Sequence, residues 1–225
     1  MINKIKHYIS SDKVSFIHIE ELLTRQHTII YASDHGFIIH DDKVNFNYIS
    51  FNDYNEMKEV LSKYKFDSYL AYDKEIVEFY GDLGNTTNLT QWMYPSKEKF
   101  DLSSFDIRKL GLEYLDIVNS KYKAIGPGEN NKDAIVKGEL IGIFEDNKLA
   151  GFIGRHPEGC TGMLLVFEEY RGKGYGFALE RAKINDLIDR DIIPFGEVVE
   201  GNTVSTKLQE KLGMIKGDKT IYWKL

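Results

Sequence analysis

Cysteine, proline and long apolar runs are all scarce in this sequence. Cys160 is the only cysteine, so no disulfide can form within the chain, and no zinc site can draw on several thiolates. The longest uninterrupted apolar run is Met163–Phe167, whereas a membrane-spanning helix needs about 20 such residues. The charged start Met1–Lys6 has no long apolar stretch behind it, so no secretory signal peptide is expected. These absences predict a cytoplasmic protein with no membrane partner.

An excess of basic residues is also lacking. The net charge is −6, which disfavours nucleic-acid binding because the phosphates need neutralising by cations. The composition, 42% hydrophobic and 28% charged, is that of an ordinary folded protein. Four histidines, His18, His27, His35 and His40, match no metal-ligand spacing, so no metal site is expected.

Segments typical of strands and of helices alternate along the whole chain, which predicts an α/β protein. The polar stretch Pro95–Ser104 is the best candidate for a linker. We therefore expect an N-terminal α/β domain over residues 1–100 and a second domain over residues 103–225. In the first domain, the expected elements are strands at 28–31, 36–39, 68–72 and 76–80, and a helix capped by Asn52 and ending near Tyr64.

The second domain has clearer signals. A hairpin at 140–155 turns at Glu145–Lys148, and a strand over Thr161–Phe167 leads into a glycine-rich loop. The other expected elements are a helix at 112–122, a loop at Gly126–Gly128, a helix at 174–190, a strand at 194–200, a helix ending at Gly213 and a strand at 221–225.

The glycine-rich loop Arg171-Gly172-Lys173-Gly174-Tyr175-Gly176 is the most informative unit. It lies between a strand and a helix, and a helix N-terminus offers unpaired N–H groups and a partial positive charge. Glycines let an anion approach those groups, and Arg171 and Lys173 add positive charge. The loop therefore predicts a pyrophosphate site. Neither nucleotide fingerprint fits, because G-x-x-x-x-G-K-[ST] is absent and G-x-G-x-x-G is one residue too long.

Two motifs make residues 103–225 similar to the GNAT superfamily of acyl-CoA-dependent N-acyltransferases. The signature Arg/Gln-x-x-Gly-x-Gly/Ala after a strand is matched by Arg171, Gly174 and Gly176. The second motif reads Asn202-x-x-Ser205-x-x-Leu208-x-x-Lys211-Leu212-Gly213 and resembles the family's helix after its fifth strand. Both motifs occur in the family's order, with a helix and a strand expected between them.

The resemblance implies a mixed, largely antiparallel sheet flanked by helices. The alternating elements of the N-terminal domain, without any motif, lead us to expect a degenerate half of the same fold there. The resemblance also implies transfer of an acyl group, acetyl first, from acetyl-CoA or another acyl-CoA to a small-molecule or peptide amine. The strand through Leu165, Val166 and Phe167 would separate from its neighbour and pair with the pantetheine arm. The remaining expected cofactor contacts are Arg171, Gly172, Lys173, Gly174, Tyr175, Gly176, Asn202 and Ser205.

The catalytic residues are less well defined. Where the family often has a tyrosine that protonates the leaving thiolate, this chain has Gln209. A protonated amine still has to lose a proton before it can attack, so a general base is needed. We expect this base to be Glu158 or Glu200, with His156 and Glu197 as alternatives, and the N–H of Val166 or Phe167 to stabilise the oxyanion. A non-catalytic acyl-CoA-binding module is the competing interpretation, and Gln209 favours it.

Overall fold

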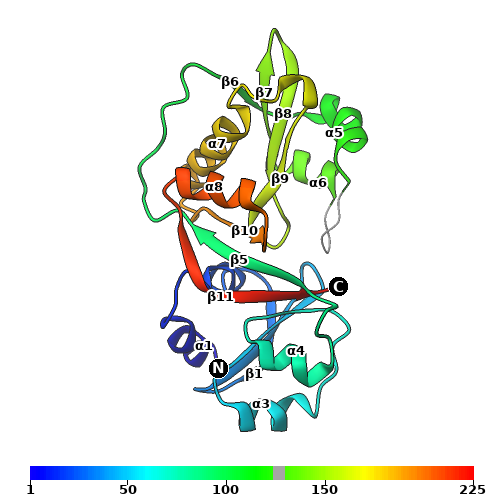
Figure 1. Ribbon diagram of the computed structural model, residues 1–225, viewed down its shortest axis with the longest axis vertical. Helices are drawn as coiled ribbons and strands as arrows, with labels where there is room; N and C mark the ends of the chain where they lie inside the picture. The colour runs from blue at the N-terminus through cyan, green and yellow to red at the C-terminus, as the bar shows by residue number, and fades with distance from the viewer. Residues whose placement is uncertain (124–129) are drawn as a thin grey trace. The chain divides into compact units, whose positions relative to one another are not determined.

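The computed structural model describes residues 1–123 and 130–225, so the loop predicted at Gly126–Gly128 lies outside the described residues. The chain forms two compact units (Figure 1). The first unit comprises Met1–Met93, Glu197–Thr206 and Ile215–Leu225, and the second comprises Tyr94–Gly196 and Lys207–Met214. Two late segments of the chain thus pack with the N-terminal residues. The division at residues 100–103 stays a prediction.

The first unit is a sheet covered by helices on both faces. Its strands lie in the order β1-β2-β3-β4-β11-β5, and all pairs are antiparallel except β3–β4. The side chains of β4 alternate between the two faces, because successive residues of a strand point in opposite directions. The strands are β1 (His27–Ala32), β2 (Gly36–Asp41), β3 (Phe46–Phe51), β4 (Tyr69–Ala71), β5 (Thr87–Met93) and β11 (Ile215–Lys224), and the helices are α1 (Ile2–Ile9), α2 (Ile17–Leu22), α3 (Tyr54–Leu61) and α4 (Lys74–Tyr80).

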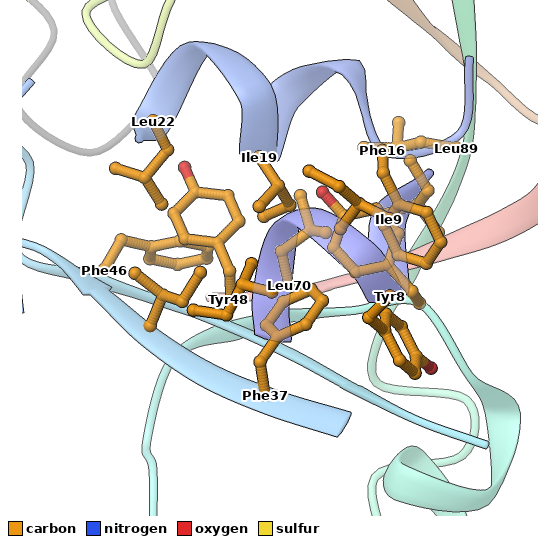
Figure 2. Close-up of a cluster of buried hydrophobic side chains, with 14 of the residues drawn as sticks. Tyr8, Ile9, Phe16, Ile19, Leu22, Phe37, Phe46, Tyr48, Leu70 and Leu89 are labelled. Atoms are coloured by element: carbon orange, nitrogen blue, oxygen red, sulfur yellow. The ribbon is translucent and has the colours of Figure 1, made fainter. Parts of the chain in front are cut away.

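One face of this sheet holds an aromatic-rich core under α1 and α2 (Figure 2). Tyr8 and Phe16 meet Phe37 of β2 edge to face, with ring centroids 5.5 and 6.1 Å apart. The opposite face packs on α3 and α4 through a second cluster that includes Ile38, Ile49 and Ile76. Both faces are apolar at β2 and β4, so residues 37–39 and 69–71 are uninterrupted hydrophobic runs in the sequence.

The segment predicted as a strand at 76–80 is a helix, α4, and that prediction was wrong. Its β-branched and aromatic residues favour a strand by composition alone. The helix ends at Gly81, whose φ of 73° is the left-handed conformation of a helix C-terminus. Ile76 and Val77 are buried on one side of this helix, so the buried residues follow the spacing of a helix and not the alternation of a strand. The helix predicted from Asn52 begins one residue later, capped by Asp53, whose carboxylate accepts a hydrogen bond from the Glu56 N–H.

The second unit is also a sheet between helices (Figure 1). Its strand order is β10-β9-β8-β7-β6; only β10–β9 is parallel, so the predicted mixed, largely antiparallel α/β fold is confirmed. The helix α7 covers one face and α5 and α6 cover the other. The elements are β6 (Asp106–Lys109), β7 (Ile141–Glu145), β8 (Lys148–Arg155), β9 (Thr161–Val166), β10 (Phe195–Val199), η1 (Leu112–Tyr114), α5 (Leu115–Lys121), α6 (Asn131–Val136), η2 (Glu168–Tyr170), α7 (Tyr175–Asp189) and α8 (Thr203–Lys211). Both β10 and α8 are divided between the two units, β10 after Gly196 and α8 after Thr206.

The segment predicted as a linker, Pro95–Ser104, has no regular secondary structure but is fastened to α7. Asn185 accepts a hydrogen bond from the Phe100 N–H and donates one to the Phe100 carbonyl, both at 2.9 Å. Lys99 also pairs with Asp189 at 2.7 Å. The segment is therefore part of the second unit.

Candidate functional site

Strand β9 loses its pairing on one edge soon after it begins. Thr161 is paired with Gly196 of β10, and this is the one β9–β10 register position in the described residues. On the other edge β9 stays paired with β8 as far as Val166, opposite Gly151. The second half of β9 therefore presents a backbone edge that no strand covers in the second unit, and its residues Leu164–Val166 are half-buried.

The free edge of β9 carries the amide of Val166. Phe167 donates its N–H to the Ala150 carbonyl at 2.9 Å, which marks this position as a hydrogen-bonded pair with β8. Because such pairs alternate along an antiparallel ladder, the backbone groups of Val166 point away from β8. Of the two amides considered for an oxyanion site, Phe167 is thus already committed and Val166 faces the free edge.

A β-bulge distorts β9 just before this edge. The register with β8 shifts by one residue between Phe152 and Gly154, and Met163 has a φ of 55°. A positive φ is uncommon for a side chain of this size, and bulges concentrate where a strand must be re-aimed or its pairing ended. The sequence gives no sign of this bulge, because Met163 lies in an uninterrupted apolar run.

The loop after β9 adopts the open form that an anion site needs. Gly172 and Gly174 have φ values of 79° and 80°, where an L-residue with a side chain is strained. A Cβ atom at either position would meet no heavy atom within 4 Å, so the space in front of the loop is open. Gly174 is the N-cap residue of α7, and the first turn of this helix contains no acidic residue. The first N–H groups of α7 therefore keep a partial positive charge that no acidic side chain of the first turn offsets.

The two cations of the loop have partners within the second unit. Arg171 donates from Nε to the Val166 carbonyl at 3.3 Å, which ties the loop back to β9. Lys173 Nζ pairs with both carboxylate oxygens of Glu145, at 2.6 and 2.8 Å. Glu145 also accepts a hydrogen bond from the Tyr175 hydroxyl. Glu145 is a residue that the sequence did not single out, since it resembles any turn residue of a hairpin.

The predicted base Glu158 lies in the turn between β8 and β9. This turn is closed by the hydrogen bond from the Gly159 N–H to the His156 carbonyl, at 2.9 Å. A Cβ atom at Gly162 would fall 2.1 Å from His156 Nε2, so the His156 ring lies directly over the start of β9. The thiol of Cys160 approaches Glu158 Oε1 to 3.7 Å. His156 and Glu158 thus lie near the beginning of β9, and the role of Glu158 stays a prediction.

Gln209, at the position where the sequence resemblance predicts a tyrosine, is buried in the second unit and is only 7% exposed. Its Nε2 donates to Glu180 Oε1 of α7 at 3.4 Å, and its Oε1 has no hydrogen-bond partner among the described residues. Burial raises the pKa of Glu180 to about 7, although the hydrogen bond from Gln209 acts in the opposite direction. Glu180 was also missed, and the available signal was a carboxyl group between the apolar positions Leu179 and Ala182 of α7.

Three predicted site residues, Glu200, Asn202 and Ser205, lie in the first unit and are described there. Asn202 is a helix N-cap, because its Oδ1 accepts a hydrogen bond from the Ser205 N–H at 3.0 Å. Glu200 is exposed, and its carboxylate accepts a hydrogen bond from Asn88 at 3.0 Å. These three residues are thus engaged locally, and their contact with a cofactor or substrate stays a prediction.

The alternative base Glu197 belongs to a buried polar network of the first unit. Its Oε1 is 3.0 Å from His18 Nδ1 and accepts a hydrogen bond from Gln91 Nε2 at 3.1 Å. His18 Nε2 lies 3.1 Å from the Tyr48 hydroxyl. His18 is 1% exposed and the Glu197 side chain 14%. The imidazole therefore links Glu197 to Tyr48, a connection that joins distant parts of the sequence.

Comparisons with known proteins identify similar sequences and similar folds. A family model of FR47-like proteins matches residues 140–223, which includes the loop and α8. No curated protein matches the chain. Among solved structures, a Drosophila protein is similar with a TM-score of 0.72 and 15% identity, covering 98% of this chain and 94% of its own.

Two further similar structures are described as acetyltransferases of the GNAT type. A GNAT-family acetyltransferase from Colwellia psychrerythraea has a TM-score of 0.58 at 14% identity, covering 100% of this chain and 94% of its own. A GCN5-related N-acetyltransferase from Kribbella flavida has a TM-score of 0.56 at 10% identity, covering 94% and 95%. The chain therefore has the fold of GNAT acetyltransferases over nearly its whole length, and the resemblance of its C-terminal half to that superfamily is confirmed.

Two kinds of feature are absent from the described residues. Within residues 1–123 and 130–225, no helix combines the length and the apolar character that a bilayer crossing requires. The same described residues contain no group of three or more His, Cys, Asp or Glu side chains arranged to hold a metal ion.

Proposed function

We propose that this chain is a cytoplasmic N-acyltransferase that moves an acyl group from acyl-CoA directly to a primary amine, with acetyl as the first candidate for the acyl group. The observation that carries the proposal is the loop between β9 and α7. Gly172 and Gly174 hold left-handed conformations that face open space, beside a strand edge that is unpaired beyond Thr161. An extended ligand with a pyrophosphate at one end fits both features, because the loop offers N–H donors and the edge offers strand-like pairing.

In this proposal each residue has a defined task. The N–H groups of Gly172–Gly176, which include Lys173 and Tyr175, bind the pyrophosphate, and Arg171 adds positive charge at the same end. Leu165, Val166 and Phe167 lie along the pantetheine arm, and the outward amide of Val166 is the donor nearest to the developing oxyanion. Asn202 and Ser205 of the first unit are proposed as further pantetheine contacts on the family resemblance alone.

The reaction needs one proton removed from the attacking ammonium group. The amine nitrogen then forms a bond to the thioester carbonyl, and the C–S bond breaks with its electron pair leaving on sulfur. The second nitrogen proton ends on the thiol, so no oxidant or further reactant is required. A thiol with a pKa near 8.5 leaves readily, which makes a dedicated acid less important than a base. We propose Glu158 as that base, with Glu200 as the second candidate.

A thermal-shift assay tests the cofactor assignment. A ligand bound only by the folded protein stabilises it by about 2.7 kcal/mol at a concentration of 100 Kd, so CoA and acetyl-CoA should raise the melting temperature. NAD and ATP should raise it distinctly less, since the loop fits neither nucleotide fingerprint. Equal shifts with ATP and CoA would contradict the proposal. Turnover of acetyl-CoA with a panel of primary amines then tests catalysis.

One observation favours a second candidate, a binding module that holds acyl-CoA without turning it over. Gln209 cannot act as an acid, and its side chain is buried against Glu180. Such a module would show the CoA-specific thermal shift without release of free thiol in the presence of any amine of the panel.

A further inference from the structure

The carboxylate of Glu145 holds two of the six residues of the glycine-rich loop. Glu145 is the last residue of β7, and its two oxygens lie 2.6 and 2.8 Å from Lys173 Nζ. The same carboxylate accepts the hydroxyl hydrogen of Tyr175, the first residue of α7. Lys173 also lies 5.5 Å from the centroid of the Tyr170 ring. One side chain outside the loop is thus fastened to both sides of Gly174.

We propose that Glu145 is a positioning residue, which fixes the conformation of the loop for acyl-CoA through Lys173 and Tyr175. This inference rests on the proposed function. It assigns Lys173 a task different from the one predicted from the sequence: its ammonium group holds the loop to the β7–β8 hairpin, and the backbone N–H groups bind the phosphates.

The glycines of the loop make a restraint by Glu145 useful for binding. Gly172 and Gly174 lie on either side of Lys173, and a glycine loses more conformational freedom on ordering than any other residue. A loop with glycines at alternate positions is therefore costly to order unless other residues restrain it. Restraint before the ligand arrives lowers the entropy cost of binding, which is the general advantage of pre-organisation.

The carboxyl group of Glu145 and the phenol of Tyr175 keep their protonation states around neutral pH. The hydrogen bonds from Lys173 and Tyr175 lower the pKa of the Glu145 carboxyl, so it stays ionised. The hydrogen bond to Glu145 raises the pKa of Tyr175 to about 12, so the phenol keeps its proton. The carboxylate thus keeps both of its partners at working pH.

Two physical effects of Glu145 on acyl-CoA binding have opposite signs, and this makes the inference testable. As a negative charge close to an anion site, Glu145 repels phosphate, so its removal should tighten binding. As a positioning residue it orders the loop, so its removal should weaken binding. A partly exposed ion pair with no positioning role would show only the first effect.

The chain offers a matched control one residue away. Asp146 carries the same charge on the same hairpin, and within residues 1–123 and 130–225 it makes no hydrogen bond or ion pair with the loop. Its φ of 50° is tolerated by asparagine, so Asp146→Asn removes the charge with little backbone cost. Comparing Glu145→Ala with Asp146→Asn therefore separates loss of charge from loss of positioning.

The experiment measures CoA binding by calorimetry at low and high NaCl, together with acetyl-CoA kinetics where turnover is present. We expect Glu145→Ala to weaken CoA binding about five- to tenfold and to raise KM without lowering kcat at saturation. Asp146→Asn should bind CoA as tightly as the wild type or more tightly. Glu145→Gln, which keeps an acceptor for Tyr175, should fall between them and controls for folding.

A double-mutant cycle with Lys173→Ala completes the test. If Lys173 acts through Glu145, the double variant binds CoA about as weakly as either single variant, because the two changes remove the same contact. Additive losses, or a Glu145→Ala protein that binds CoA as tightly as Asp146→Asn, overturn the inference and leave the proposed function intact. A wild-type protein that does not bind CoA overturns both.

Discussion

Gln209 donates a hydrogen bond to the carboxyl group of Glu180 across 3.4 Å, and both side chains are 93% buried between α7 and the C-terminal part of α8. Gln209, at the position where the resemblance to the GNAT family predicts a tyrosine, has an amide side chain that cannot donate a proton to a leaving group. Its neighbour is a carboxyl group that burial keeps close to half-protonated at neutral pH, because its pKa is about 7. The hydrogen bond between Gln209 and Glu180 thus connects α8 to α7, the helix that follows the glycine-rich loop.

Glu180 should make the stability of the protein fall as the pH rises. Its pKa is about 7 in the fold and 4.5 as an ordinary glutamate, so folding favours the protonated form. The stabilisation is fully present below pH 4.5 and is lost as the pH passes through 7. A shift of this size corresponds to about 3 kcal/mol. Urea unfolding should therefore show Glu180→Gln losing less stability than the wild type between about pH 5 and about pH 8.

The control for this experiment is Glu169→Gln, which changes an exposed glutamate next to the loop. It should follow the wild-type pH dependence. If Glu180→Gln also follows the wild type, the carboxyl group of Glu180 is ionised in the fold and the assignment is wrong.

Gly174→Ala should weaken CoA binding by more than its effect on stability explains. Its φ of 80° costs an alanine about 1 kcal/mol, and the new Cβ meets no protein atom but projects into the space proposed for the pyrophosphate. Gly213→Ala is the matched control, since Gly213 has a φ of 73° and equally open surroundings at the end of α8. Melting temperatures should fall similarly for both variants, and calorimetry should find weaker CoA binding only for Gly174→Ala. Equal CoA affinity in the two variants would contradict the pyrophosphate site.

Arg171→Ala should weaken acyl-CoA binding by about 1.5–3 kcal/mol, the range for one charge-assisted hydrogen bond. Because the proposed partner is a phosphate remote from the thioester, the loss should raise KM for acetyl-CoA and leave kcat nearly unchanged. Steady-state kinetics with acetyl-CoA varied to saturation measures both quantities. Lys148→Ala, an exposed cation of the same unit, controls for loss of charge alone. Turnover that stays low at saturating acetyl-CoA would show that Arg171 acts elsewhere.

Glu158→Gln should lower kcat by about 100-fold and remove the acidic limb of the pH profile, as expected for a general base. Glu200→Gln and Glu197→Gln are the comparison variants, and each of these two glutamates also has hydrogen-bond partners that give it a structural role. Glu200 is held by Asn88, and Glu197 by His18 and Gln91. Pre-steady-state measurements of thiol release across pH would distinguish the three. If Glu158→Gln keeps normal turnover with its acidic limb in place, the base is Glu197 or Glu200.

The loop was recognisable in the sequence because its function depends on local chemistry. Glycines at 172, 174 and 176 after an apolar strand predict a loop that an anion can approach, and in the structure Gly172 and Gly174 have positive φ values. Strand and helix positions in residues 140–213 were also predictable, since apolar periodicity is strong there. The N-terminal residues were harder: α1, α2, β3 and β5 were not predicted, and α4 was predicted as a strand.

The sequence by itself determined the α/β class, the glycine-rich loop and the motif through Asn202 and Gly213, because each depends on residue types at short spacing. Only the tertiary structure decided which partners the charged residues have. Lys173 meets Glu145, Gln209 meets Glu180, and His18 meets Glu197, over sequence separations of 28, 29 and 179 residues. Helical and strand periods report the face on which a side chain lies. Which distant side chain it meets depends on how the strands are ordered and joined, and local residue patterns do not specify that.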